Sequence, residues 1–162
     1  MNPEEEFWGR LDEVDAGMLG LTSCKTMLPM APSLREDYDG NIWFITTQGV
    51  EMVTVLTLSP QIAQFVVADA KSGLYATVEG KLSLEDEPDI IEELWSPVTA
   101  AWFEDARKEA ALRLLRFTPS SGIAWYSSTQ GVQFLYDIAR AKMDTTPSAT
   151  GWTARLAFSP PV

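Results

Sequence analysis

The chain of 162 residues carries 12 Lys and Arg against 23 Asp and Glu, a formal net charge of −11, and it contains one cysteine and no histidine. Its length fits one domain, and its charge would repel nucleic-acid phosphates and anionic membrane surfaces, so neither is an expected partner. The chain therefore has no Cys/His set for structural zinc, no intrachain disulfide, and no imidazole to activate a serine or cysteine nucleophile.

The N-terminal segment predicts a helix. Pro3 and an acidic first turn at residues 4–6 precede apolar residues at helical spacing, so we expect a helix over residues 4–16 that ends at Gly17. This segment lacks the basic start and apolar stretch of a secretory signal, and no apolar run reaches spanning length. A cytoplasmic protein is therefore expected, and a single cysteine is consistent with a reducing compartment.

Short apolar runs separated by turn residues predict strands in the next part of the chain. Residues 18–24 and 26–34 are predicted to form paired strands, with Pro29 and Pro32 placing the second strand at an edge or a bulge. The Asp39-Gly40 dipeptide predicts a tight hairpin before a strand over residues 41–46. A short helix is expected from residue 49 until the proline at position 60 stops it.

The second half of the chain continues this β-rich pattern. Residues 61–69 and 73–85 predict two strands, residues 86–103 predict helical pieces on either side of Pro97, and residues 112–119 and 122–128 predict two further strands. Residues 129–143 have the spacing of a closing helix. We divide the chain into a domain over residues 1–143 and a C-terminal extension over 144–162 with room for one docked strand. The absence of regular strand-helix alternation predicts a mainly β protein, an antiparallel barrel with accessory helices.

Four segments carry a family resemblance when they are taken in order: DGNIWFITT, KSGLYATVEGKL, IIEELWSPVTAAWF and LRLLRFTPSSGIAWY. Together with shorter pieces that cover residues 5 to 143, they resemble the FMN-binding split-barrel superfamily of the pyridoxamine 5′-phosphate oxidases, and within it the bacterial general stress proteins. The resemblance implies a six-stranded antiparallel split β-barrel of Greek-key type flanked by helices. It also implies a homodimer with two FMN sites at the subunit interface.

The resemblance implies a cofactor site whose phosphate positions are apolar in this chain. Relatives that hold FMN carry an Arg before the proline of the second strand, and later a Ser followed two residues on by a Lys. The matching positions here are Leu28, Val50 and Met52. Losing an Arg and a Lys would weaken FMN binding by roughly two to four tenfold steps, because each charge-assisted hydrogen bond contributes about 1.5–3 kcal/mol. The implied cofactor-binding residues are Leu28, Pro29, Met30, Ile45, Thr46, Thr47, Val50, Met52 and Trp125.

Some polar groups near these positions remain available to a phosphate. They are the hydroxyls of Thr46 and Thr47, the backbone amides around Gly49, and Lys25 on the neighbouring strand. Trp125 matches a tryptophan that lies beside the flavin in the oxidases. Packing at the barrel end or in a dimer interface is an equal alternative for this residue.

Three functions remain open at this point, and no catalytic residue is assigned. The first is an FMN-dependent oxidoreductase acting on a small molecule. The second is a non-catalytic dimer that holds a less anionic flavin or another aromatic small molecule. The third is a stress-related dimer without a cofactor. Pyridoxamine 5′-phosphate oxidase activity itself is disfavoured, because those enzymes use a C-terminal Arg-x-His segment. Cys24 is expected to be a buried, inert thiol.

Overall fold

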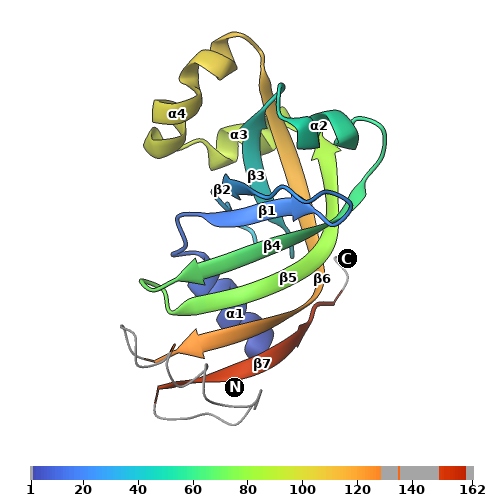
Figure 1. The fold of residues 1–162 in the computed structure, drawn as a ribbon. Coiled ribbons are helices and arrows are strands. Elements are labelled where there is room, and N and C mark those ends of the chain that lie inside the picture. The colour runs from blue at the N-terminus through green and yellow to red at the C-terminus, as the bar shows by residue number, and fades with distance from the viewer. Residues whose placement is uncertain (1, 129–134, 136–149, 160–162) are drawn as a thin grey trace.

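The described residues form seven strands in one antiparallel sheet (Figure 1). The computed structural model describes residues 2–128, 135 and 150–159. Hydrogen-bonded neighbours follow the order β2-β1-β4-β5-β6-β3, and β7 pairs with β6 beside this path. The curved sheet stays open, which confirms the predicted split barrel. The strands are β1 Gly17–Leu21, β2 Leu28–Met30, β3 Ile42–Thr47, β4 Gln61–Asp69, β5 Leu74–Glu85, β6 Leu112–Ser127 and β7 Gly151–Ala157.

Strand β6 is one continuous element of 16 residues where two strands were predicted. One of its edges pairs with β5, while the other pairs first with β3 and then with β7. The register with β5 shifts between Glu79 and Gly80. A Cβ atom added at Gly80 would lie 2.3 Å from the backbone oxygen of Thr118, so glycine is what allows the two strands to remain in contact through this irregularity.

The seventh strand comes from the segment predicted as an extension. Strand β7 pairs with β6 from Ser121↔Ala157 to Ser127↔Gly151, and Ala154 and Leu156 belong to the buried core. The docked strand expected in that segment is therefore present. The helix predicted over residues 129–143 lies outside the described residues, apart from position 135.

Four helices accompany the sheet in the described part of the chain: α1 Pro3–Leu11, α2 Glu51–Leu56, α3 Pro88–Leu94 and α4 Pro97–Lys108. Helix α1 ends five residues earlier than predicted, and Gly17 opens β1 instead of ending the helix. The Asn2 side chain caps α1 by accepting hydrogen bonds from the backbone N–H groups of Glu4 and Glu5. Helix α4 begins at Pro97, as expected, with Ser96 as its cap. Among the described residues, no helix combines the length and apolar character needed to cross a bilayer.

The core has two parts on opposite faces of β3. Alternate residues of this strand, Ile42 and Phe44, join the main cluster together with Phe65 and Phe117. The residues that alternate with them, Trp43 and Ile45, face a smaller cluster on the other side of the strand, which α3 covers through Ile90. The alternation follows from the two-residue period of a strand, and it explains why IWFITT lacks a polar face.

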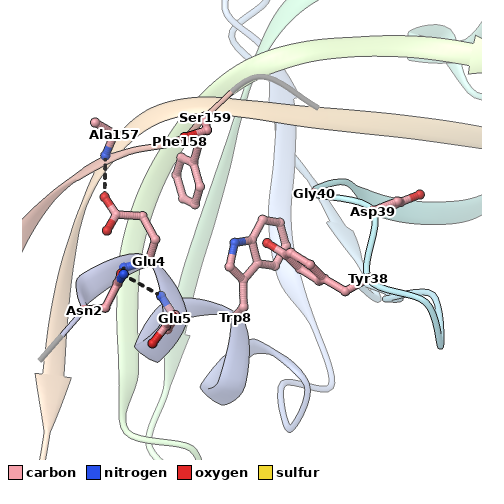
Figure 2. Close-up of a pocket in the computed structure, with 10 residues that line it drawn as sticks. All are labelled: Asn2, Glu4, Glu5, Trp8, Tyr38, Asp39, Gly40, Ala157, Phe158 and Ser159. Carbon is pink, nitrogen blue, oxygen red and sulfur yellow. Dashed lines mark hydrogen bonds between the residues drawn. The ribbon is translucent and has the colours of Figure 1, made fainter. Parts of the chain in front are cut away.

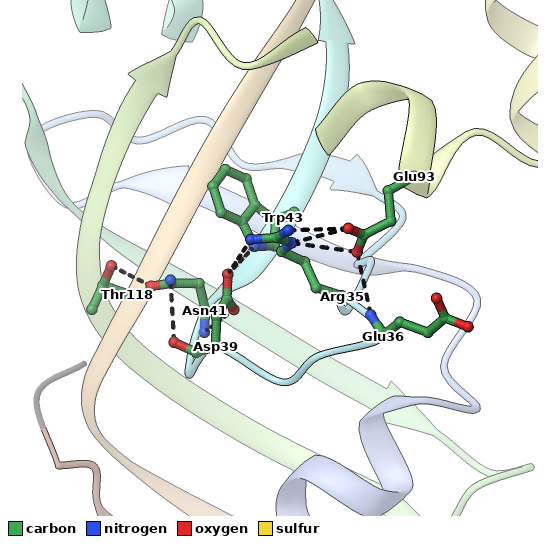
Figure 3. Close-up of polar contacts among 7 residues, drawn as sticks. All are labelled: Arg35, Glu36, Asp39, Asn41, Trp43, Glu93 and Thr118. Atoms are coloured by element: carbon green, nitrogen blue, oxygen red, sulfur yellow. Dashed lines mark hydrogen bonds and ion pairs between the residues drawn. The ribbon is translucent and has the colours of Figure 1, made fainter. Parts of the chain in front are cut away.

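The loop between β2 and β3 differs from the predicted tight hairpin. An isolated bridge joins Ser33 to Trp43, and residues 34–41 form the loop that leads into β3. Gly40 lies near the loop's end at φ 77°, in the left-handed region that favours glycine. Figure 3 shows the polar contacts that hold this loop. The Arg35 guanidinium lies 3.0 Å from a Glu93 carboxylate oxygen on α3, and the Trp43 indole N–H donates to Asp39 at 2.9 Å.

Candidate functional site

Three of the implied cofactor positions converge on one pocket of about 480 Å³. Leu28 comes from β2, while Val50 and Met52 come from the start of α2. The volume falls within the range of about 300–1,000 Å³ that is typical of small-molecule sites. The other lining residues are Leu21, Cys24, Lys25, Thr26, Glu51 and Val55.

Local structure explains why these side chains meet. Leu28 pairs with Leu19 across the antiparallel β1–β2 ladder, and the intervening turn carries Lys25 to the rim of the pocket. Helical spacing in α2 turns Met52 and Val55 toward the pocket. Met52 is only 6% exposed and also belongs to the main core. The pocket thus has a rigid apolar floor and a more exposed rim.

The charges around this pocket nearly cancel. Lys25 is the one cation that lines it among the described residues, and Glu51 places a carboxylate on the same wall. Lys25 makes no hydrogen bond or ion pair with any residue that the structure describes. Helix α2 has six residues, and its N-cap Val50 makes no side-chain capping bond. Such a short helix adds little to the positive potential, so this pocket suits an apolar ring better than a doubly charged phosphate.

None of the six remaining implied positions lines this pocket. Pro29 is exposed on the edge strand, and Met30 is buried in the main core. Ile45 packs beside Trp43 under α3, on the opposite face of β3 from Thr46. Thr46 is buried, Thr47 is half-buried, and neither lines the pocket. The hydroxyls expected to compensate for the missing cations are therefore not part of its wall.

Trp125 lies on β6, away from the other implied positions. Its cross-strand partners are Tyr75 on β5 and Thr153 on β7, and it is half-buried. Strands β1, β4 and β5 lie between β6 and β2, the strand that carries Leu28, and Trp125 does not line the Leu28 pocket. Four strand spacings of about 4.8 Å make roughly 19 Å along the sheet between the two strands. Trp125 and the Leu28 pocket thus do not form a single site within one chain.

Two residues of the pocket were not anticipated in their present role. Cys24 was predicted to be buried, but its side chain is exposed and lines the pocket rim. It sits in the turn after β1, between Ser23 and Lys25, where the backbone has left the sheet and the neighbouring residues are also exposed. Glu51 had no signal of its own, since an acidic first helical turn is common. Among the described residues, no group of three His, Cys, Asp or Glu side chains is arranged to hold a metal ion.

Comparisons with known proteins agree with this architecture. The family described as pyridoxamine 5′-phosphate oxidase like matches residues 2–148. A crystal structure from Jannaschia sp. CCS1, assigned as a general stress protein 26, is 37% identical with a TM-score of 0.78, covering 96% of this chain and 98% of the other. No curated protein matches the chain.

Two structures from Xanthomonas are also similar. One is assigned as a general stress family protein of Xanthomonas campestris, with 26% identity, a TM-score of 0.68, and coverage of 81% of this chain and 93% of the other. The second is a general stress FMN/FAD binding protein of Xanthomonas citri, with 26% identity, a TM-score of 0.68, and coverage of 78% and 90%. With a family match over residues 2–148 and a relative at 37% identity, the chain belongs to the pyridoxamine 5′-phosphate oxidase-like family, and general stress proteins are among its relatives.

Proposed function

We propose that this protein binds a flavin through the ring system, with the phosphate contributing little to affinity. The observation that carries the proposal is the convergence of Leu28, Val50 and Met52 on one pocket with Lys25 at its rim. A relative named as an FMN/FAD binding protein supports the ligand class. The apolar residues at the phosphate positions support binding through the flavin ring, because an apolar wall stabilises an aromatic surface and gives no counter-charge to an anion.

The balance between Lys25 and Glu51 bears on which flavin binds best. A single exposed ammonium at the rim offers a phosphate about one charge-assisted hydrogen bond, and the nearby carboxylate opposes it. Riboflavin, which lacks the phosphate, avoids this opposition. We therefore expect riboflavin to bind at least as tightly as FMN.

A homodimer is part of this proposal. Trp125 and Tyr75 are cross-strand neighbours, and both are half-buried. The outer face that they share would give a second protomer an aromatic surface to pack against. In such a dimer the Trp125 face of one protomer would lie beside the Leu28 pocket of the other and form the aromatic wall of its site. Crosslinking or light scattering measures the dimer directly.

A bound flavin would supply electron transfer to or from a small substrate. The chain's own residues would bind and orient it: Leu28, Val50 and Met52 through apolar contact, and Lys25 through its charge. With no histidine in the chain, a proton needed by the substrate would come from water or a carboxylate.

A second candidate function is non-catalytic binding of another uncharged aromatic molecule in the same pocket. Glu51 supports an uncharged ligand, because a carboxylate on the wall disfavours every anionic ligand, FMN included. The two candidates differ in whether any flavin binds at all.

Titration of the purified protein with lumiflavin, riboflavin and FMN, followed by quenching of flavin fluorescence, separates them. We expect micromolar binding of riboflavin and equal or weaker binding of FMN. A matched pair of variants locates the rim cation: Lys25→Met should weaken FMN more than riboflavin, while Lys81→Met, at an exposed lysine outside the pocket, should change neither. FMN bound more than tenfold tighter than riboflavin would show that the phosphate is held elsewhere. No binding of any flavin would favour the second candidate.

A further inference from the structure

A second pocket, which shares no lining residue with the first, lies between the start of α1, the loop before β3 and the end of β7 (Figure 2). Its volume is about 630 Å³. Among the described residues no Lys or Arg lines it, while three aromatic rings and three carboxylates do: Trp8, Tyr38, Phe158, Glu4, Glu5 and Asp39. The wall thus combines π surfaces with acidic groups.

The three rings form a nearly perpendicular cluster around Trp8. The ring centroid of Trp8 lies 4.8 Å from that of Tyr38, with the planes at 76°, and 5.7 Å from that of Phe158, with the planes at 73°. In Figure 2 the Phe158 and Tyr38 rings flank the indole on either side. Tyr38 is 53% exposed, so much of its surface faces solvent. Ring faces carry negative potential and attract cations within about 6 Å of the centroid.

The loop that carries Tyr38 is held in place independently of any ligand. Asp39 accepts hydrogen bonds from the Trp43 indole N–H at 2.9 Å and from the Asn41 backbone N–H at 3.0 Å. Arg35 and the Glu36 backbone N–H both bind Glu93 on α3 (Figure 3). A preorganised ring loses little conformational entropy when a ligand arrives.

The acidic groups differ in how far they are already paired. Asp39 faces Arg35 at 3.9 Å, and Glu4 accepts the Ala157 backbone N–H at 3.0 Å, which ties α1 to the end of β7. Glu5 has no basic partner in the part of the chain that the structure describes. Partial burial, with a smaller effect from Asp39, raises the pKa of Tyr38, so its ring remains neutral at physiological pH.

We propose that this aromatic and acidic pocket binds a small organic cation that carries an alkylated ammonium group. Aromatic faces with nearby carboxylates are the surroundings in which a bulky, weakly hydrated cation is stabilised. A metal ion is a poorer match, since no metal-binding group of three side chains occurs among the described residues. This site does not depend on the flavin proposal.

The charge of the ligand is the decisive variable in the test. Choline and tetramethylammonium are titrated into the full-length protein by calorimetry, alongside 3,3-dimethyl-1-butanol, in which carbon replaces the choline nitrogen. Saturable binding of both cations is expected, with the neutral alcohol at least about tenfold weaker. A shift of the Trp8 indole N–H signal in NMR, assigned with Trp8→Phe, places the ligand. Equal binding of the alcohol, or no saturable heat with either cation, would overturn the proposal.

Variants at exposed positions separate the ring from the charge. Tyr38→Leu should weaken choline binding by roughly 3- to 30-fold, whereas Tyr38→Phe should retain it. Glu5→Gln should weaken binding by about 2- to 5-fold at low salt and less at high salt, while Glu13→Gln, at an exposed acid outside the pocket, leaves it unchanged. Unaltered affinity in Tyr38→Leu, with its melting temperature preserved, would also contradict the proposal.

Discussion

Leu28→Arg restores one of the missing cations at the position where the structure tolerates it best. Leu28 is half-buried on the edge strand β2 and lines the pocket beside Lys25. Met52→Lys, by contrast, would place an ammonium at a site that is 6% exposed and part of the main core. Arginine at position 28 keeps its aliphatic stem over the apolar wall while its guanidinium reaches the open rim.

The expected gain for FMN follows from one new charge-assisted hydrogen bond. Such a bond contributes about 1.5–3 kcal/mol, and exposure of the rim places this case at the lower end, near 1.5 kcal/mol or about tenfold in affinity. Replacing the half-buried leucine costs about 1 kcal/mol of unfolding free energy, so the melting temperature of Leu28→Arg should fall by only about 2–5 °C.

The assay compares FMN with riboflavin in the same fluorescence titration. FMN should bind Leu28→Arg about tenfold more tightly than the parent protein, and riboflavin should bind both proteins alike. Leu28→Gln serves as a polar, uncharged control and should leave the ratio of the two affinities unchanged. If both flavins gain equally, or FMN gains nothing, then this pocket does not receive the phosphate and the assignment of Leu28 is wrong.

Three further predictions concern the fold. Tyr126→Phe removes a buried hydroxyl that donates to a backbone carbonyl of α1 at 2.6 Å, and should lower unfolding free energy by about 1 kcal/mol. Burial is the main cause of the raised pKa of Tyr126. The stability that its neutral phenol contributes is therefore complete below pH ~10 and is lost as the pH rises further. In urea unfolding between pH 9 and 11, Tyr126→Phe should lose less stability than the parent protein. The hydrogen bond from Arg35 is the main cause of the lowered pKa of Glu93. The stability that the Glu93 carboxylate contributes is therefore present above pH ~4.3 and is lost as the pH falls. In thermal scans at acid pH, the melting temperature of Glu93→Gln should fall less with decreasing pH than that of the parent protein. Gly80→Ala should destabilise by about 1–3 kcal/mol because its Cβ would meet the Thr118 carbonyl, whereas Gly9→Ala, with nothing within 4 Å, should stabilise α1 slightly.

Each of these outcomes has a clear opposite. If stability falls as steeply with rising pH in Tyr126→Phe as in the parent protein, the phenol of Tyr126 does not titrate on unfolding. If Glu93→Gln loses as much stability at acid pH as the parent protein, the ion pair between Arg35 and Glu93 is absent in solution. Equal stability of the two alanine variants would show that β5 and β6 separate more easily at Gly80 than the close approach indicates.

Local periodicity was enough to locate most of the elements. Strand β4 has the predicted bounds, Gln61–Asp69, and β5 differs by one residue at its start. Both succeed because side chains that alternate between core and solvent leave a two-residue pattern in the chain. The continuity of β6 could not be predicted from the same signals, because Pro119 and Gly122 resemble a turn until β5, β3 and β7 are seen to pair on both sides of it.

The sequence by itself determined the family, the mainly β architecture and the apolar character of the phosphate positions, since motifs and residue types are properties of the chain alone. Only the tertiary structure decided that Leu28, Val50 and Met52 share a pocket with Lys25 and Glu51, and that Trp125 does not. It alone brought Trp8, Tyr38 and Phe158 together from three distant segments. The physical reason is that a side chain's type sets what it can bind, whereas its neighbours depend on how the whole sheet and its helices pack.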